Sequence, residues 1–322
     1  MRGAWALICL TLFAMAPALR AADYPMRPIR FVVPYVAGGP TDVLGRMVAD
    51  HLTRDLKQSV FIENKGGAQG AIGAELVAHA DPDGYTVLFT VSSVLELNPM
   101  LYKKLAYDPD RDFRVLGIVS DLPMIMIVHP SVPAKTLAEF VAYAKQNPAK
   151  LNFGSAGTGG IGHLAGEMFK QTAGAEMTHV PYKGAGPALT DLISGNIQLM
   201  FETVGTALPP IKAGLLLPLG VSSPERIADL PDLPTIAESG YPDYRVSVWY
   251  GAAAPARVPE EVVQTIRASI NRALGDEAFR ASLTKVGFAP LRPLSEAATK
   301  EFIDTDRARW SVVIKKLNIS LD

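Results

Sequence analysis

The sequence predicts an α/β protein of two lobes, between which the chain crosses twice. Short apolar strands alternate with amphipathic helices nearly throughout, which is the pattern of parallel sheets flanked by helices. A glycine-rich strand-to-helix turn occurs at 34–42 and again at 154–162. No tandem repeat or low-complexity tract interrupts the chain, which is long enough to bury a core of its own.

The first unit alternates strand, helix, strand, helix and strand. Its predicted elements are Ile29–Val33, Pro40–Leu56, Val60–Asn64, 71–80 and Thr86–Thr90. In the long helix Leu44, Val48 and Leu52 recur on one face, as a period of 3.6 residues requires. Asp81-Pro82-Asp83-Gly84 supplies a turn before the third strand.

The second unit follows 111–119 and repeats the pattern. Its predicted strands are Met124–Val128, Leu151–Phe153, Met177–Val180 and Ile197–Phe201, and its helices are Leu137–Gln146, His163–Ala173 and Pro187–Ser194. Residues 203–245 are predicted as turns and short elements. Strand Val246–Ala252 and helices Glu260–Leu274 and Ser295–Leu317 close the chain. We therefore expect lobe 1 to contain residues 23–123 and 247–322, and lobe 2 residues 124–246.

Residues 1–22 are predicted as a signal peptide, because Arg2 precedes an apolar run at 4–16 and small residues follow. Cleavage is expected near Ala21. The alternative, an uncleaved anchor, would need a span of about 20 apolar residues, longer than this run. Cys9, the single cysteine, lies in this segment, so the mature chain has none. An exported protein that reaches an oxidising compartment without disulfides fits this pattern.

Charge excludes one class of partner. The chain has 31 basic and 32 acidic residues and no arginine run, so nucleic acid is not an expected partner. No later segment is apolar enough to span a bilayer.

The two glycine turns predict anion binding. Each exposes backbone N–H groups at a helix N-terminus, where unsatisfied donors and a partial positive charge attract anions. Two such ends predict a cleft that holds an anionic small molecule from both sides. Asp42 would cap its helix, pair with Arg46 or meet a ligand amine, and Lys183 would contact the ligand or remain solvated.

Other side chains are candidates for the same cleft. Glu202 lies just after a predicted strand of a parallel sheet, and ligands bind at the C-terminal ends of such strands. Tyr35 and Trp249 would form aromatic walls or belong to the core.

Three chemical alternatives are weaker. Gly157–Gly162 matches G-x-G-x-x-G, but Tyr182 stands where a dinucleotide site needs an acid about 20 residues further on. A nucleotide-dependent exported enzyme is therefore the alternative function. His163 and Glu167 share a helical face, yet a metal site needs more ligands. Ser155 does not lie in G-x-S-x-G. We expect no catalytic residue, no cofactor and no metal.

A set of short segments gives a more specific indication. These segments are Val33-Pro34-Tyr35, Gly38-Gly39-Pro40-Thr41-Asp42, Glu63-Asn64-Lys65, Pro82-Asp83-Gly84-Tyr85-Thr86, Gly154-Ser155-Ala156-Gly157, His163-Leu164-Ala165-Gly166-Glu167, His179-Val180-Pro181-Tyr182-Lys183-Gly184 and Trp249-Tyr250-Gly251. In order and spacing they resemble the extracytoplasmic solute-binding receptors of tripartite tricarboxylate transporters, the TctC or Bug family. The resemblance runs from about Tyr24 to Leu317.

The resemblance implies a two-lobed periplasmic binding protein of type II with its ligand cleft between the lobes. It implies a monomer that closes on a small carboxylate without covalent chemistry and delivers it to the large and small permease subunits of a transporter. The ligand-binding residues that it implies, together with the candidates above, are Tyr35, Ala37, Gly38, Gly39, Thr41, Asp42, Ser92, Ser93, Ser155, Gly157, Thr158, His163, Lys183, Gly184, Gly186 and Glu202.

Two departures from the family pattern bear on the ligand. Glu202 stands where the family usually has aspartate, and 159–161 read Gly-Gly-Ile where polar small residues are common. The more apolar turn favours an aromatic or aliphatic dicarboxylate over citrate. A receptor that feeds a signalling partner, and the sensing lobes of a transcriptional regulator, share this architecture; an export signal and the lack of a helix-turn-helix oppose the regulator.

Overall fold

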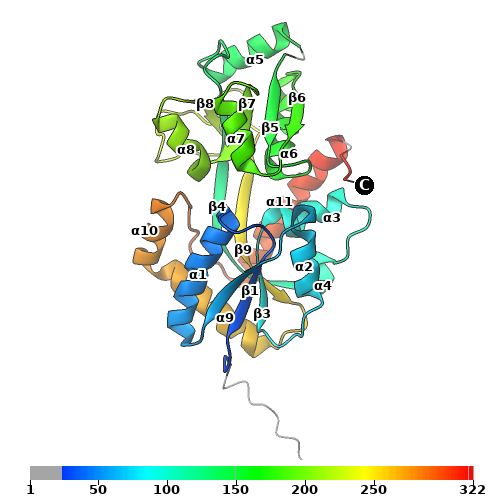
Figure 1. Ribbon diagram of the computed structural model, residues 1–322, viewed down its shortest axis with the longest axis vertical. Coiled ribbons are helices and arrows are strands. Elements are labelled where there is room, and N and C mark those ends of the chain that lie inside the picture. Colours follow the sequence, from blue (N-terminus) through cyan, green and yellow to red (C-terminus); the bar gives the residue numbers. More distant parts are fainter. Residues whose placement is uncertain (1–23, 149, 318, 322) are drawn as a thin grey trace, which may run out of the picture.

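The computed structural model describes residues 24–148, 150–317 and 319–321, which form two lobes (Figure 1). The predicted leader at 1–22 and its cleavage near Ala21 lie outside the described residues. No helix in the described part of the chain is long and apolar enough to cross a bilayer.

The N-terminal elements build one side of the lobe 1 sheet. They are β1 (Ile29–Val33), α1 (Pro40–Leu56), β2 (Val60–Asn64), the short helix η2 (Ala68–Gly70), α2 (Ala71–Ala78) and β3 (Thr86–Val91). β1 pairs in parallel with both β2 and β3. The predicted bounds of β1, α1 and β2 are confirmed, since each is a local apolar pattern with a turn or Pro40 at its edge. A π-helix (η3, Ser93–Leu97), α3 (Asn98–Leu101) and α4 (Pro109–Asp112) follow.

Two long strands join the lobes (Figure 1). β4 (Phe113–Val128) pairs with β9 (Ser247–Pro255) as far as Pro123, and with β7 and β8 from Met124 onward. The expectation of a strand that starts at Met124 is therefore wrong, because β4 begins 11 positions earlier, at Phe113, in lobe 1. β9 is antiparallel to β3 and β4, so the sheet is mixed rather than purely parallel. A strand that returns from lobe 2 enters lobe 1 in the opposite direction.

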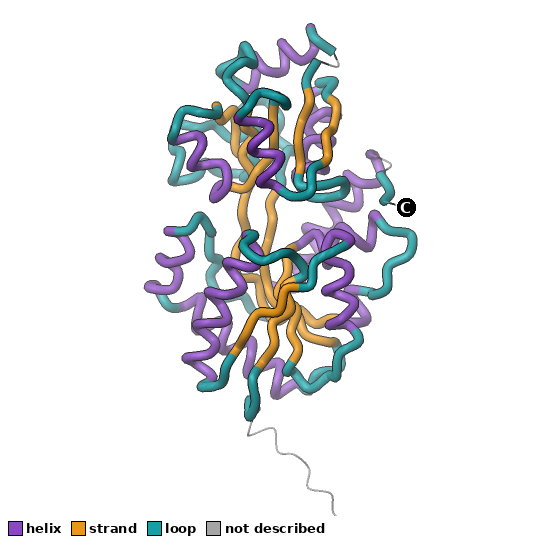
Figure 2. The backbone as a smooth tube through the Cα atoms, in the orientation of Figure 1, coloured by secondary structure: helices purple, strands orange, loops and turns teal. Residues whose placement is uncertain are grey.

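Lobe 2 repeats the strand–helix alternation. Its elements are α5 (Leu137–Gln146), β5 (Asn152–Ser155), α6 (Ile161–Ala173), β6 (Thr178–Pro181), α7 (Ala185–Ile193), β7 (Leu199–Thr203), α8 (Val204–Lys212) and β8 (Leu217–Val221). β5 pairs in parallel with β6 and β7, and helices flank these strands (Figure 2). α8 and β8 occupy part of the segment predicted as turns.

The C-terminal helices return to lobe 1. They are α9 (Glu260–Gly275), α10 (Glu277–Lys285), which sequence did not predict, and α11 (Glu296–Leu317). α11 packs against α3 of lobe 1 and α6 of lobe 2. At its end Gln171 Nε2 of α6 donates to Lys316 O over 3.4 Å, and Leu321 N donates to Leu101 O over 2.9 Å.

One apolar core continues from lobe 1 through the two crossing strands into lobe 2. Phe31 and Phe89 stack in lobe 1, while Phe169 meets Tyr244 edge to face in lobe 2. Each such aromatic ring contributes about 1.5–3 kcal/mol by leaving water. The core thus holds the carboxyl ends of β1, β3, β5, β6 and β7 in fixed positions.

Candidate functional site

The first glycine turn joins β1 to α1. Gly38 takes a left-handed φ of +84° and Gly39 is the N-cap residue of α1, with Pro40 at the first helical position. Pro40 carries no N–H, and the amides of Thr41 and Asp42 lie too early in the helix to reach a carbonyl four residues before them. The sequence thus places open backbone donors at this end of the lobe 1 sheet.

Asp42 holds this turn in shape. Its carboxylate accepts from Gly38 N (2.9 Å), Arg46 Nε (3.0 Å) and Asn64 Nδ2 (2.9 Å). Burial acts to raise the pKa of Asp42, but these hydrogen bonds outweigh it and lower the pKa below the usual value. Of the alternatives weighed from sequence, the structure has the pairing with Arg46; a ligand contact stays a prediction.

Tyr35 and Ser93 meet where β1 and β3 end, and Ser92 precedes Ser93 in the chain. The hydroxyls of Tyr35 and Ser93 lie 3.2 Å apart. Burial raises the pKa of Tyr35 to about 12 despite that bond, so the phenol stays protonated. Ser92 Oγ is fully buried and has no hydrogen-bond partner among the described residues. A buried hydroxyl that is left unpaired carries a desolvation cost.

The second glycine turn joins β5 to α6. Gly157 (φ +142°) and Gly159 (φ +81°) take backbone conformations that side chains disfavour. Ser155 Oγ donates to Gly157 O (3.1 Å) and accepts from Gly157 N (3.2 Å), which closes the turn. Gly160 is the N-cap residue of α6, so the first-turn amides of this helix also lack helical partners.

Two stacked histidines contact the second turn and help to hold its shape. His163 and His179 have ring centroids 3.9 Å apart. His163 Nδ1 accepts from Gly159 N (3.0 Å), and His179 Nε2 lies 2.7 Å from Ser155 Oγ. Burial lowers the pKa of His163 to about 4 and, with the neighbouring His163, that of His179 to about 3. Both rings are neutral at pH 7, which leaves Nδ1 of His163 free to accept.

A third turn lies beside the second. Tyr182 N donates to Ser155 O (3.0 Å), and Lys183 and Gly184 then lead into α7. Lys183 is exposed and bonds to none of the described residues. A Cβ added at Gly184 or Gly186 would meet nothing within 4 Å, so this backbone is open.

Glu202 lies at the carboxyl end of β7 and is only 8% exposed. Its Oε1 accepts from Thr203 N (2.8 Å) and Thr203 Oγ1 (3.1 Å). Burial raises the pKa of Glu202 more than these bonds lower it, and no basic side chain of the described residues pairs with it. Glu202 in turn raises the pKa of Tyr250, after burial itself.

Direct contacts join the lobes beside these residues. Gln69 Nε2 in η2 donates to Thr158 O in the second turn over 3.2 Å. A Cβ added at Gly287, after α10, would lie 2.5 Å from Gly205 Cα in α8. Gln69 was not predicted as a site residue: it lies in a glycine-punctuated stretch without periodicity.

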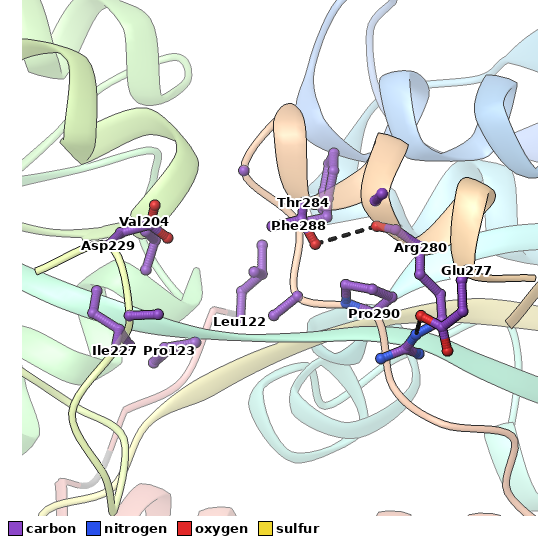
Figure 3. Close-up of a pocket in the computed structure, with 14 residues that line it drawn as sticks. Leu122, Pro123, Val204, Ile227, Asp229, Glu277, Arg280, Thr284, Phe288 and Pro290 are labelled. Carbon is purple, nitrogen blue, oxygen red and sulfur yellow. Dashed lines mark hydrogen bonds and ion pairs between the residues drawn. The ribbon is translucent and has the colours of Figure 1, made fainter. Parts of the chain in front are cut away.

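A pocket of about 470 Å³ also opens between the lobes, but it contains none of the predicted site residues. Figure 3 shows Val204, Ile227 and Asp229 of lobe 2 facing Thr284 and Phe288 of lobe 1 across it. Leu122 and Pro123 of β4 lie between the two walls. The side chains that line the pocket are mostly apolar, and Arg280 Nη1 donates a hydrogen bond to Leu291 O over 2.8 Å. We do not assign the carboxylate site to this pocket, because none of the three glycine turns described above lines it.

A buried carboxyl lies behind the site. Glu96 Oε1, in the π-helix, accepts from Trp249 Nε1 of β9 over 2.8 Å, and Oε2 has no partner among the described residues. Burial raises the pKa of Glu96 to about 8. Trp249 thus belongs to the core and bonds Glu96. Neither the π-helix nor this bond could be inferred from apolar periodicity.

The metal hypothesis is not supported. His163 Nδ1 is occupied by Gly159 N, and Glu167 pairs with Lys170 at 3.0 Å. The described residues contain no group of three or more His, Cys, Asp or Glu side chains that could hold a metal ion.

Comparison with protein families adds an independent result. The family model described as "Tripartite tricarboxylate transporter family receptor" (TctC) matches residues 44–319. BugT of Bordetella pertussis is 32% identical over 308 residues, or 95% of this chain and 94% of that protein. A protein encoded in the TAR-I ttuE–ttuC′ intergenic region of Agrobacterium vitis is 37% identical over 285 residues, or 88% and 82% of the two chains.

Solved structures agree with this match. A protein of R. palustris with adipate superposes with a TM-score of 0.86 at 34% identity, covering 92% of this chain and 99% of that one. MatC of Rhodopseudomonas palustris with bound malate gives 0.82 at 32%, covering 90% and 100%. The periplasmic binding protein BugD gives 0.82 at 35%, covering 92% and 99%. The two-lobed binding-protein fold and the absence of enzymatic function in this class accord with the predictions from sequence.

Proposed function

Since this chain belongs to the tripartite tricarboxylate transporter receptor family, TctC or Bug, we propose that it captures a dicarboxylate between its lobes and delivers it to a membrane permease. It is a solute-binding receptor and not an enzyme. The relatives with adipate and with malate support an acid with two carboxylates as the ligand.

One observation carries the proposal: Gln69 of lobe 1 donates to Thr158 O in the second glycine turn, and its own carbonyl lies 3.5 Å from the hydroxyl of Tyr35 in the first glycine turn. The turns precede α1 and α6, and that of α7 lies beside the second. Each supplies first-turn amides and a partial positive charge, which suit a carboxylate without an arginine. The contacts proposed are those predicted from sequence at these three turns, at Ser92 and Ser93, and at Tyr35.

Glu202 sets a condition on the ligand. A buried carboxylate without a basic partner would repel a dianion, whereas a protonated carboxyl can donate a hydrogen bond to it. The raised pKa of Glu202 favours the protonated form. We infer that one end of the acid approaches Glu202 in this form, while the other binds the helix N-termini.

Closure is proposed to pivot on β4 and β9. β4 changes its partner from β9 to β7 between Pro123 and Met124, and β9 begins at Ser247. This change of partner supports lobe boundaries at 123/124 and 246/247. A hinge at two crossing strands lets the lobes rotate without breaking either sheet.

Export and partners complete the proposal. The relatives are periplasmic binding proteins, and the leader pattern at 1–22 supports export to the periplasm with cleavage near Ala21. We propose a monomer that docks on the large and small permease subunits. Loss of acid uptake in a strain without the gene would favour this role over that of a receptor for a signalling partner.

A thermal-shift panel of mono-, di- and tricarboxylates tests ligand capture. A dicarboxylate at 100 times its dissociation constant should stabilise the protein by about 2.7 kcal/mol. NAD and ATP serve as controls for the nucleotide alternative and should have no effect. A panel in which no carboxylate raises the midpoint would oppose the proposal, and a mass spectrum of the native protein would identify any acid that co-purifies.

A further inference from the structure

Gln69 of lobe 1 makes a hydrogen bond to lobe 2. It belongs to η2, between β2 and α2, and its side chain leaves lobe 1 to donate from Nε2 to Thr158 O over 3.2 Å. A Cβ added at Gly157 would lie 2.8 Å from that same nitrogen. The amide of Gln69 is therefore packed against the second turn as well as hydrogen-bonded to it.

The backbone of Gln69 is held in a conformation that glycine would prefer. Ala68 and Gln69 take φ values of +46° and +50°. Side chains rarely adopt this region, and such conformations persist only where the surroundings determine them. The backbone of Gln69 is therefore strained at the same residue whose side-chain amide bonds the other lobe.

Buried polar groups fix the base of Gln69. Its carbonyl accepts from Asn98 Nδ2 (3.1 Å), and Tyr35 OH approaches it at 3.5 Å. Asn98 is buried and bonds Tyr107 OH at 3.3 Å, and Tyr107 OH donates to Val94 O at 2.5 Å. These bonds remain within lobe 1, so they persist when the lobes separate. Only the bond to Thr158 depends on closure.

We propose that Gln69 is a latch: a positioning residue whose side-chain amide holds the two lobes together around the ligand and slows their opening. This inference rests on the proposed closure of the lobes. Because the bond is exposed to water on one side, its loss should lower the ratio of closed to open molecules by about 3- to 10-fold, the range of a single net hydrogen bond.

Interlobe distance in the ligand-free protein tests the latch. Spin labels on Glu75→Cys in α2 and Ala142→Cys in α5, both exposed, report the separation of the lobes by pulsed electron resonance. Cys9→Ser removes the only native thiol of the full chain. The distance should be measured in the labelled protein with Gln69 intact and in its Gln69→Ala and Gln69→Gly variants. The Gln264→Ala variant serves as a matched control.

The short-distance population should fall in both Gln69 variants and stay unchanged in Gln264→Ala, since Gln264 is exposed and bonds Glu260 within α9. Gln69→Gly separates the latch from folding: glycine relieves the left-handed strain, so its thermal midpoint should not fall. A protein that lacks the short distance altogether, or keeps it in Gln69→Ala and Gln69→Gly, would overturn the latch. No carboxylate is present, so the outcome is independent of whether the proposed ligand is correct.

Discussion

Gly205 and Gly287 touch backbone to backbone across the two lobes. Gly205 is in the first turn of α8, and a Cβ added there would lie 3.3 Å from Gly287 O and 3.4 Å from Gly287 Cα. Gly287, at φ +87°, follows α10. No side chain intervenes, so the separation of the lobes at this edge is set by the two main chains.

We expect Gly205→Ala to hold the lobes slightly apart. The distance from the added methyl to the backbone of Gly287 would be shorter than an ordinary van der Waals contact. Because that backbone is rigid, the clash is relieved only if the lobes move apart. Folding should be unharmed, because alanine favours a helix by up to about 1 kcal/mol over glycine. Small-angle scattering should show a larger radius of gyration. Gly275→Ala, in α9 with open space around it, is the control; equal radii for both variants would oppose the prediction.

Asp42→Asn should destabilise the protein by about 1–3 kcal/mol, because the buried carboxylate loses its charge-assisted bonds to Arg46 and the Gly38 amide. Its lowered pKa means that this contribution is present above the ordinary pKa of about 3.9 and is lost as pH falls through the folded-state pKa. Urea unfolding at pH 7 and pH 3 should show the two proteins converging at low pH. Asp50→Asn, exposed on the same helix, should match the unsubstituted protein at both.

The histidine pair predicts an acid-sensitive turn. His163 and His179 have pKa values lowered from 6.5 to about 4 and 3 by burial, so the unfolded chain binds protons first. Stability is therefore lost as pH falls below 6.5, by at most about 1.4 kcal/mol per pH unit for each ring. His163→Asn and His179→Gln should reduce this slope in unfolding experiments from pH 7 to pH 5. If His79→Gln, an exposed substitution on α2, reduces it equally, the pair is not the cause.

Glu96 predicts the opposite trend at higher pH. Burial raises its pKa from 4.5 to about 8, while Arg307 and Arg309 of α11 act to lower it and Asp121 of β4 to raise it. The folded state keeps the proton longer, so stability falls as pH rises from 4.5 through 8, by at most about 1.4 kcal/mol per unit.

Glu96→Gln should flatten that dependence and be more stable than the unsubstituted protein at pH 8, since glutamine keeps an acceptor for Trp249 Nε1. Chemical unfolding at pH 5 and pH 8 measures this. Glu75→Gln, exposed on α2, is the matched control. A Glu96→Gln protein that is weaker at pH 8 would refute a neutral Glu96.

Lys183→Met should change the affinity for the dicarboxylate found in the thermal-shift panel by less than about fivefold. The ammonium is exposed, and an exposed charge contributes about 1 kcal/mol or less. Isothermal titration gives the dissociation constants. A loss of a hundredfold would mean that the lysine, rather than the backbone of the turn, binds the acid.

Local patterns decided which elements were predictable. β1, α1 and β2 carry their own periodicity and stop signals, whereas α8 contains Pro209 and Pro210, which indicate turns when met in a sequence. Gly117 and Pro123 break the pattern of β4, and only its pairing with β9 makes it continuous. Pairing with a distant strand leaves no local trace.

The same division applies to the site. Glycine turns before helices can be predicted from the sequence, because their backbone conformation favours glycine. Gln69 and Glu96 have no such signature: their partners, Thr158 and Trp249, lie 89 and 153 positions away. The stacking of His163 on His179 likewise depends on the position of β6 beside α6, which leaves no signal in the sequence.

The placement of β9 fixes the order in which the molecule can be completed. β9 separates β3 from β4 in the lobe 1 sheet, yet Gly251 of β9 is synthesised long after Thr90, its partner in β3. Lobe 2 needs only strands that follow one another closely, from β4 to β8. The second lobe can therefore form while the chain is still growing, whereas the first must leave a strand-wide gap until its C-terminal part emerges.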